Sequence, residues 1–161
     1  MKTSNQKAPM SKGAIYKLML ILVYIVAPVY LIKNLVGGVA SGAAIIAVCL
    51  TVFAVIIFAM KKMNATDEKK QLVVSISMVG LVFLISISSG QYYSDDYSLY
   101  MAVMCISGLY MEPKITNVQC VLIPIVLVVQ YILHPEKVES LSQFIMCVVV
   151  FTLAAVILFL L

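Results

Sequence analysis

The chain has 161 residues, of which 63% are hydrophobic and 11% are charged, and its formal net charge is +4. Soluble domains are about 45–50% apolar and about 25% charged, so this composition excludes a water-soluble fold. We therefore predict an all-α, polytopic membrane helix bundle, with a cytoplasmic N-terminal tail over residues 1–13 and a single transmembrane domain over residues 14–161.

Six apolar segments follow one another, separated by charged or turn residues. A helix needs about 20 apolar residues to cross a bilayer, and most of the segments reach that length. Lys33, Asn34 and the Gly37-Gly38 pair predict a tight turn after the first segment. The predicted helices cover residues 14–32, 39–60, 71–89, 98–111, 115–133 and 140–161, the last starting at a capping box.

Small residues recur at the start of the second segment. Gly38 and Gly42 have GxxxG spacing, and Ala43 and Ala47 are also four residues apart. Such spacing lets two helix backbones approach closely, which favours a helix-packing face. The alternative is that these residues face lipid.

The fourth segment is short for a spanning helix. Residues 98–111 contribute about 14 apolar residues, a length that also suits a re-entrant or interfacial element. If the tyrosine-rich stretch from Tyr92 lies in the headgroup zone, the helix becomes long enough to span.

The lysines predict the orientation, because cytoplasmic loops of membrane proteins carry an excess of basic residues. With both termini in the cytoplasm, nine lysines lie inside and two outside. A re-entrant fourth segment leaves that ratio unchanged. We therefore expect a multi-pass protein of a bacterial cell (plasma) membrane, with Lys2, Lys7, Lys12, Lys17, Lys61, Lys62, Lys69, Lys70 and Lys114 inside and Lys33 and Lys137 outside.

A cluster of acids and tyrosines lies at the predicted outer mouth between the third and fourth helices. Asp95 and Asp96 stand beside Tyr92, Tyr93 and Tyr97. Carboxylates with aromatic neighbours hold cationic or hydroxylated small ligands through charge-assisted hydrogen bonds and cation–π contacts. The alternative is a solvated loop with interfacial tyrosines. These five residues are the candidate ligand site.

No motif predicts an enzyme, a cofactor site, a metal site or a nucleic-acid partner. The sequence has no phosphate-binding loop, zinc-ligand set or nucleophile elbow. The expected partners are the lipid bilayer, a second copy or another membrane protein, and a small-molecule ligand. The cysteines lie in apolar runs and are expected to be reduced packing residues; they are Cys49, Cys105, Cys120 and Cys147.

One stretch, SGLYMEPKITNVQCV at residues 107–121, has a pattern of its own: an apolar run ends in Leu-Tyr, a charged turn follows, and the next helix contains Asn. The pattern resembles the N-terminal six-helix membrane sensor region of methyl-accepting chemotaxis-type signal transducers of low-GC Gram-positive bacteria. Its positions are Leu109, Tyr110, Glu112, Lys114 and Asn117.

The resemblance implies a sensory, signal-transducing input module. Pro113 departs from the usual Asp or Lys in the turn, and the 161 residues do not include a signalling coiled coil. We therefore expect an output part to follow the sixth helix in a longer protein. Similar membrane modules also precede cyclase-type output domains.

Two other classes of protein fit the same six segments. The substrate-binding subunit of a vitamin or metal uptake transporter is also a compact six-helix protein. It would capture a substrate with the outer polar residues and dock on a partner through the face from Gly38 to Ala47. A small accessory protein that only assembles with other helices is the third possibility.

Overall fold

A computed structural model describes residues 11–88, 93–110 and 113–160 of the chain. The described residues form six α-helices and two short 3₁₀ turns, and no strand occurs among them, which confirms the predicted all-α bundle. The elements are α1 (Lys12–Val36), α2 (Ala40–Lys62), α3 (Asp67–Ser88), η1 (Tyr93–Asp96), α4 (Tyr97–Tyr110), α5 (Pro113–Leu133), η2 (Pro135–Lys137) and α6 (Leu141–Leu160).

Several helices begin and end at residues that suit their positions. The Ser11 hydroxyl accepts a hydrogen bond from the Ala14 backbone N–H at the start of α1. Asp67 and Glu68 open α3, where acids favour the positive end of the helix dipole. Pro113 is the first residue of α5, a position where its missing N–H costs nothing. α1 continues beyond the predicted turn residues Lys33 and Asn34 to Val36.

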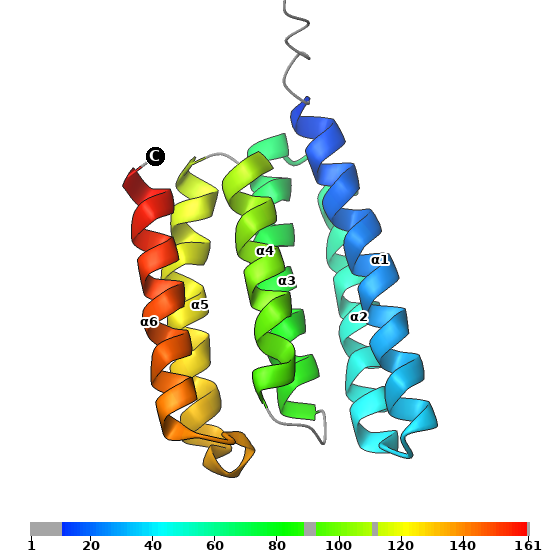
Figure 1. Cartoon of the computed structure of the whole chain (residues 1–161). Coiled ribbons are helices and arrows are strands. Elements are labelled where there is room, and N and C mark those ends of the chain that lie inside the picture. Colours follow the sequence, from blue (N-terminus) through cyan, green and yellow to red (C-terminus); the bar gives the residue numbers. More distant parts are fainter. Residues whose placement is uncertain (1–10, 89–92, 111–112, 161) are drawn as a thin grey trace, which may run out of the picture.

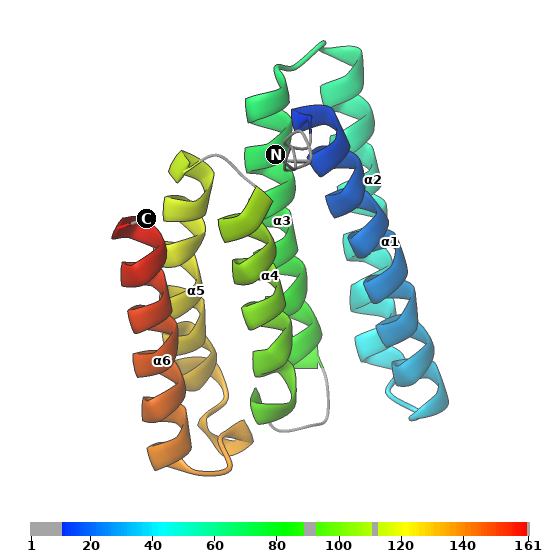
Figure 2. The same ribbon diagram turned by 45° about the horizontal axis from the view of Figure 1, so that its top comes forward.

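The helices alternate in direction, so that α1 begins and α6 ends at the same end of the bundle (Figure 1). α3 is the central helix and packs against α1, α2, α4 and α5. Figure 2 shows α3 and α4 between the α1–α2 pair on one side and the α5–α6 pair on the other. η1 and η2 lie together at one end of the bundle, which we call the η end (Figure 1).

Five of the described helices are long and apolar enough to cross a membrane: α1, α2, α3, α5 and α6. α4 has 14 residues and is shorter than these five helices, as expected for this segment. η1 leads directly into α4 at the η end, and α4 finishes at the opposite end, where α5 starts (Figure 1). α4 thus runs between the two ends instead of returning to the end where it began.

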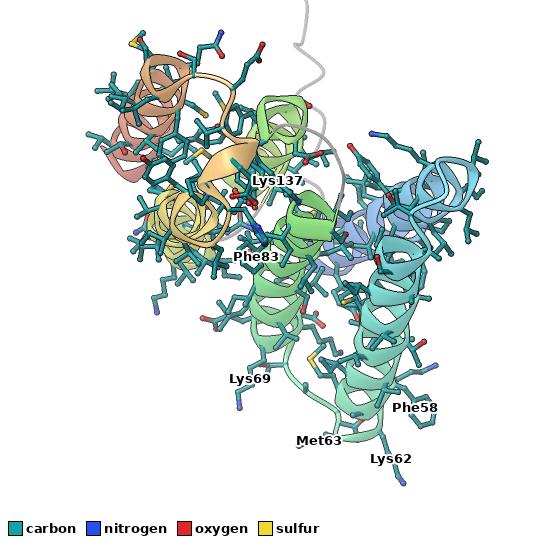
Figure 3. The ribbon with its side chains drawn as sticks, turned by 90° about the horizontal axis from the view of Figure 1, so that it is seen from below. Phe58, Lys62, Met63, Lys69, Phe83 and Lys137 are labelled. Atoms are coloured by element: carbon teal, nitrogen blue, oxygen red, sulfur yellow. The ribbon has the colours of Figure 1, made fainter. Side chains whose placement is uncertain are left out.

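Large apolar side chains are exposed over much of the outside of the bundle. Buried side chains such as Met19, Val79 and Leu127 fill the space between helices. Phe58 on α2 is 69% exposed and projects away from the ribbon (Figure 3). Such a surface is compatible with a multi-pass membrane protein, because lipid covers it at no hydrophobic cost.

The small residues of α2 divide into two groups. Gly42 and Ala43 are buried, and a Cβ on Gly42 would lie 2.9 Å from the backbone oxygen of Ser88 on α3. Gly38 lies in the α1–α2 turn with φ +74° and has no neighbouring atom within 4 Å of a Cβ. Ala47 is exposed, because the buried face of α2 continues through Ile46 and successive helical residues are rotated by about 100°. Of the four residues of the predicted packing face, Gly42 and Ala43 are buried in the bundle and Gly38 and Ala47 are exposed.

Candidate functional site

The buried polar side chains at the η end form one group, which we call the Asp96 cluster. Asp96 itself is only 1% exposed, and Ser86, Tyr93, Tyr100 and Gln130 are equally well buried. Lys137 of η2 is half-buried beside them. The cluster is therefore Ser86, Tyr93, Asp96, Tyr100, Gln130 and Lys137.

Local geometry places three of these residues on one face. Tyr93 and Asp96 are three residues apart in the 3₁₀ turn η1, where side chains at i and i+3 lie above one another. Tyr100 follows Asp96 by four residues on the first turns of α4, which continues the same face. This face is turned toward α3 and α5.

Hydrogen bonds join this face to two other helices. The Ser86 hydroxyl of α3 donates to the Asp96 carboxylate, with an Oγ–Oδ2 distance of 2.8 Å. The Tyr93 hydroxyl donates to the Gln130 backbone oxygen of α5 at 3.2 Å. The Gln130 amide nitrogen donates to the Tyr100 hydroxyl at 2.9 Å. α3, α4 and α5 are thus tied together at the η end.

Lys137 adds a positive charge to the cluster. Its Nζ donates to the Ile87 backbone oxygen at 2.6 Å and lies 5.9 Å from the centre of the Tyr93 ring. Ile87 is in the last turn of α3, where carbonyls lack partners within the helix and carry partial negative charge. In Figure 3, Lys137 lies where η2 meets the end of α3, whereas Lys62 and Lys69 project away from the ribbon.

Burial controls the protonation of the groups at this end. Burial, together with the smaller effects of the Glu136 and Asp96 charges, raises the pKa of Tyr93 to about 12, so the hydroxyl stays a neutral donor at physiological pH. Burial lowers the pKa of Lys137, and the negative charges of Glu136 and Asp96 oppose that change. Glu136 is exposed and forms a 2.8 Å contact with His134 Nδ1.

The candidate ligand residues have different locations. Tyr93 and Asp96 lie together inside the bundle. Asp96, which was expected at the outer mouth between the third and fourth helices, is therefore a buried carboxylate. Tyr97 is half-buried and lines a groove of about 390 Å³ between α4 and α6. Tyr92 lies outside the described residues, and of Asp95 only the backbone, in η1, is described.

Sequence reasoning missed four members of the cluster: Ser86, Tyr100, Gln130 and Lys137. Their separation along the chain explains this, since the Tyr93–Gln130 contact spans 37 positions and the Lys137–Ile87 contact spans 50. One signal was present, because Gln130 is a strong hydrogen-bonding group inside the apolar run of the fifth segment.

A second set of buried polar residues lies toward the opposite end, on the same three helices. We call it the Gln119 cluster. The Gln119 amide donates to the Ser75 backbone oxygen at 3.3 Å, and the Thr116 hydroxyl donates to the Ser107 backbone oxygen at 3.0 Å. Buried apolar residues separate the two clusters. The Gln119 cluster is Gln71, Ser75, Ser107, Thr116 and Gln119, and the residues between the clusters include Val79, Val82, Ile123 and Leu127.

Within the described part of the chain, no group of three or more His, Cys, Asp or Glu residues could hold a metal ion, and the four cysteines are free thiols. The arrangement at the η end instead offers a carboxylate, a backbone carbonyl and an aromatic face to a cation. Comparison with known proteins gives no matching family model, curated protein or solved structure.

Proposed function

We propose that the chain is a membrane-embedded input module of a chemoreceptor-like signal-transducing protein, and that the Asp96 cluster is where it responds to its stimulus. The observation that carries this proposal is the burial of Asp96 in a hydrogen-bonded group between three helices. Ionisable residues inside membrane bundles are costly and usually serve a function.

The connections of the cluster suit signal transduction. Its bonds link α3, α4 and α5 at the η end, and the same three helices carry the Gln119 cluster nearer the opposite end. A stimulus that rearranges the Asp96 cluster would move these helices and so alter their other ends. The resemblance of residues 107–121 to chemoreceptor membrane regions points to the same class of protein.

The proposed orientation places the η end outside a bacterial plasma membrane and both termini in the cytoplasm. Lys61, Lys62, Lys69 and Lys70 then flank the cytoplasmic link between α2 and α3, in agreement with the positive-inside rule. Reporter fusions should give inside, outside, inside and outside signals after Lys70, Ser94, Lys114 and Lys137, respectively. An outside signal after Lys114 would contradict this topology.

A chimera tests the function. A cytoplasmic enzyme whose activity depends on the helix that precedes it is fused after Leu161, and its output is measured in cells. Asp96→Asn should change the basal output at least several-fold, because it removes the buried charge and keeps the shape. Glu139→Gln is the matched control, since Glu139 is exposed at the same end. Equal output from both variants and the unchanged chain would reject the Asp96 cluster as the responsive site.

The transporter-subunit alternative is favoured by one observation, the exposure of α2. Ser41, Ala44, Ala47 and Ala54 are all exposed on this helix, and small residues allow a partner helix to approach closely. Copurification separates the two proposals. A transport subunit should bring down an energy-coupling membrane partner in stoichiometric amount, whereas an input module should not.

A further inference from the structure

The Lys137 ammonium occupies a site formed by residues of α3 and η1. It donates to the Ile87 carbonyl at 2.6 Å, its Nζ lies 5.9 Å from the centre of the Tyr93 ring, and it feels the charge of the buried Asp96. These three groups come from the end of α3 and from η1, not from the turn that carries the lysine. The chain therefore places its own cation against a surface that α3 and η1 supply.

We propose that the Asp96 cluster is a primary-ammonium site that Lys137 fills in the resting protein, and that the stimulus is a small organic ammonium compound that displaces Lys137. This inference rests on the proposed sensory function and specifies the chemical class of its ligand.

The groups around the Lys137 Nζ atom favour an ammonium group over other ions. A primary ammonium has three N–H donors on a compact charge, which matches a carbonyl, a ring face and a nearby carboxylate. Calcium prefers six to eight oxygen ligands, whereas Lys137 Nζ is held by a carbonyl oxygen and an aromatic ring face, which suit an ammonium group. Anions are disfavoured by the Asp96 charge and by the negative end of the α3 dipole.

The position of Lys137 makes displacement feasible. Lys137 belongs to the three-residue turn η2 between α5 and α6, and the other two residues of the turn, Pro135 and Glu136, are exposed. Burial lowers the pKa of the Lys137 amine, so the protein holds the charged form less favourably than water does. A lysine side chain is also long and flexible, and Glu136 in the same turn offers it a carboxylate in water.

Displacement would have a structural consequence. The Lys137–Ile87 hydrogen bond ties η2 to the end of α3. Its loss frees the turn between α5 and α6 from α3, while Tyr93 and Tyr100 remain bound to Gln130. An incoming ammonium would keep the charge of Asp96 compensated and yet leave the turn released, which gives the site two distinct states.

The first experiment removes the internal cation and replaces it in solution. Lys137→Ala deletes Cγ, Cδ, Cε and Nζ, which together correspond to n-propylammonium. In the full chain in phosphatidylcholine nanodiscs, Lys137→Ala should lower the melting temperature, and n-propylammonium should raise it again in a saturable manner. Tetramethylammonium, which has no N–H donor, should not. Lys69→Ala, at an exposed lysine, is the matched control and should respond to neither compound.

The same variant in phosphatidylethanolamine nanodiscs distinguishes two sources of the ligand. Restoration of the melting temperature by this lipid alone would identify its headgroup as a source of the ammonium. Restoration only by the free amine would identify a soluble compound. The proposal is overturned if n-propylammonium and tetramethylammonium act alike on Lys137→Ala.

A second measurement covers the case in which Lys137→Ala does not fold. In the unchanged chain with ¹⁵N-labelled lysine, Lys137 should have an Nζ resonance distinct from those of exposed lysines, and n-propylammonium should move it to their position. A resonance that stays in place at every amine concentration would also overturn the proposal. Neither measurement uses an output domain, so a failure here leaves the Asp96→Asn chimera test of the sensory function intact.

Discussion

The α1–α2 pair and the α3–α5 interface differ in how they are held together. Within the described part of α1 and α2, the buried residues are apolar or small apart from Asn34 near the end of α1. The interface among α3, α4 and α5, with η1 and η2 at its η end, instead contains both the Asp96 cluster and the Gln119 cluster. Van der Waals packing suffices to hold helices in lipid, whereas buried hydrogen bonds also fix their register. The difference teaches that α1 and α2 form a scaffold and that the polar interface carries the specific interactions.

The largest effect on stability is expected for Asp96→Ala. This change removes the carboxylate that accepts the Ser86 hydrogen bond and one of the two negative charges that act on Lys137, the other being that of Glu136. Hydrogen bonds to charged groups contribute about 1.5–3 kcal/mol. The free energy of unfolding in mixed micelles should fall by about this amount. Glu139→Ala, at an exposed acid of the same end, should change it by less than about 0.5 kcal/mol. Equal losses for both would mean that the η end is no more specific than the rest of the surface.

A glycine series tests the scaffold. Gly42→Ala should cost about 1–3 kcal/mol, because its Cβ would lie 2.9 Å from the Ser88 backbone oxygen, which cannot move aside easily. Gly108→Ala should cost less, since the nearest atom is in the flexible Leu158 side chain. A Cβ added at Gly80 would have no neighbouring atom within 4 Å, so Gly80→Ala should stabilise α3 by up to about 1 kcal/mol. Melting temperatures in one detergent would establish the order, and a reversed order would contradict the packing at Gly42.

The two polar clusters should respond differently to the same substitution. Gln130→Leu removes the donor to the buried Tyr100 hydroxyl and should cost about 1–3 kcal/mol. Gln119→Leu removes a single 3.3 Å bond to a helix carbonyl and should cost less than about 1 kcal/mol. Chemical unfolding of both variants in the same micelles measures the difference. If Gln119→Leu is the more costly change, the Gln119 cluster is the stronger tie.

The smallest effect is expected for Ala47→Leu on the exposed face of α2. An added apolar side chain there meets lipid, so the free energy of unfolding should change by less than about 0.5 kcal/mol. The oligomeric state, measured by light scattering in detergent, should also stay the same. A loss of stability together with a loss of oligomers would show that a second copy packs against this face.

The helices were predictable from hydropathy, but their ends were not. Apolar runs show which residues lie in the membrane interior, but the helices extend beyond these runs into polar residues. α3 begins at Asp67, four residues before the predicted start, and α1 includes Lys33 and Asn34. The Lys33 side chain can reach water from inside a helix, and Asn34 is buried in the bundle. A polar residue therefore does not by itself end a helix in this chain.

The candidate site was predictable only in part, for a related reason. The sequence identified Tyr93 and Asp96 by their chemistry and placed them near water. Whether a carboxylate next to a helix faces solvent or the interior depends on its neighbours across the bundle, here Ser86 and Lys137. Those neighbours are supplied by the tertiary fold, which no local pattern encodes.

Pro124 in the middle of α5 has a mechanical consequence. A proline has no N–H to donate to the carbonyl four residues earlier, which here belongs to Cys120, so α5 bends most easily at this point. Gln130 lies about 9 Å along the helix on one side and Gln119 about 7.5 Å on the other, at 1.5 Å per residue. α5 thus consists of two arms of nearly equal length joined at a point of easy bending. The arm that carries Gln130 can therefore tilt toward one side of the bundle while Gln119 keeps its place, and α3 and α4, which contain no proline, are the helices better suited to carry a displacement to the opposite end.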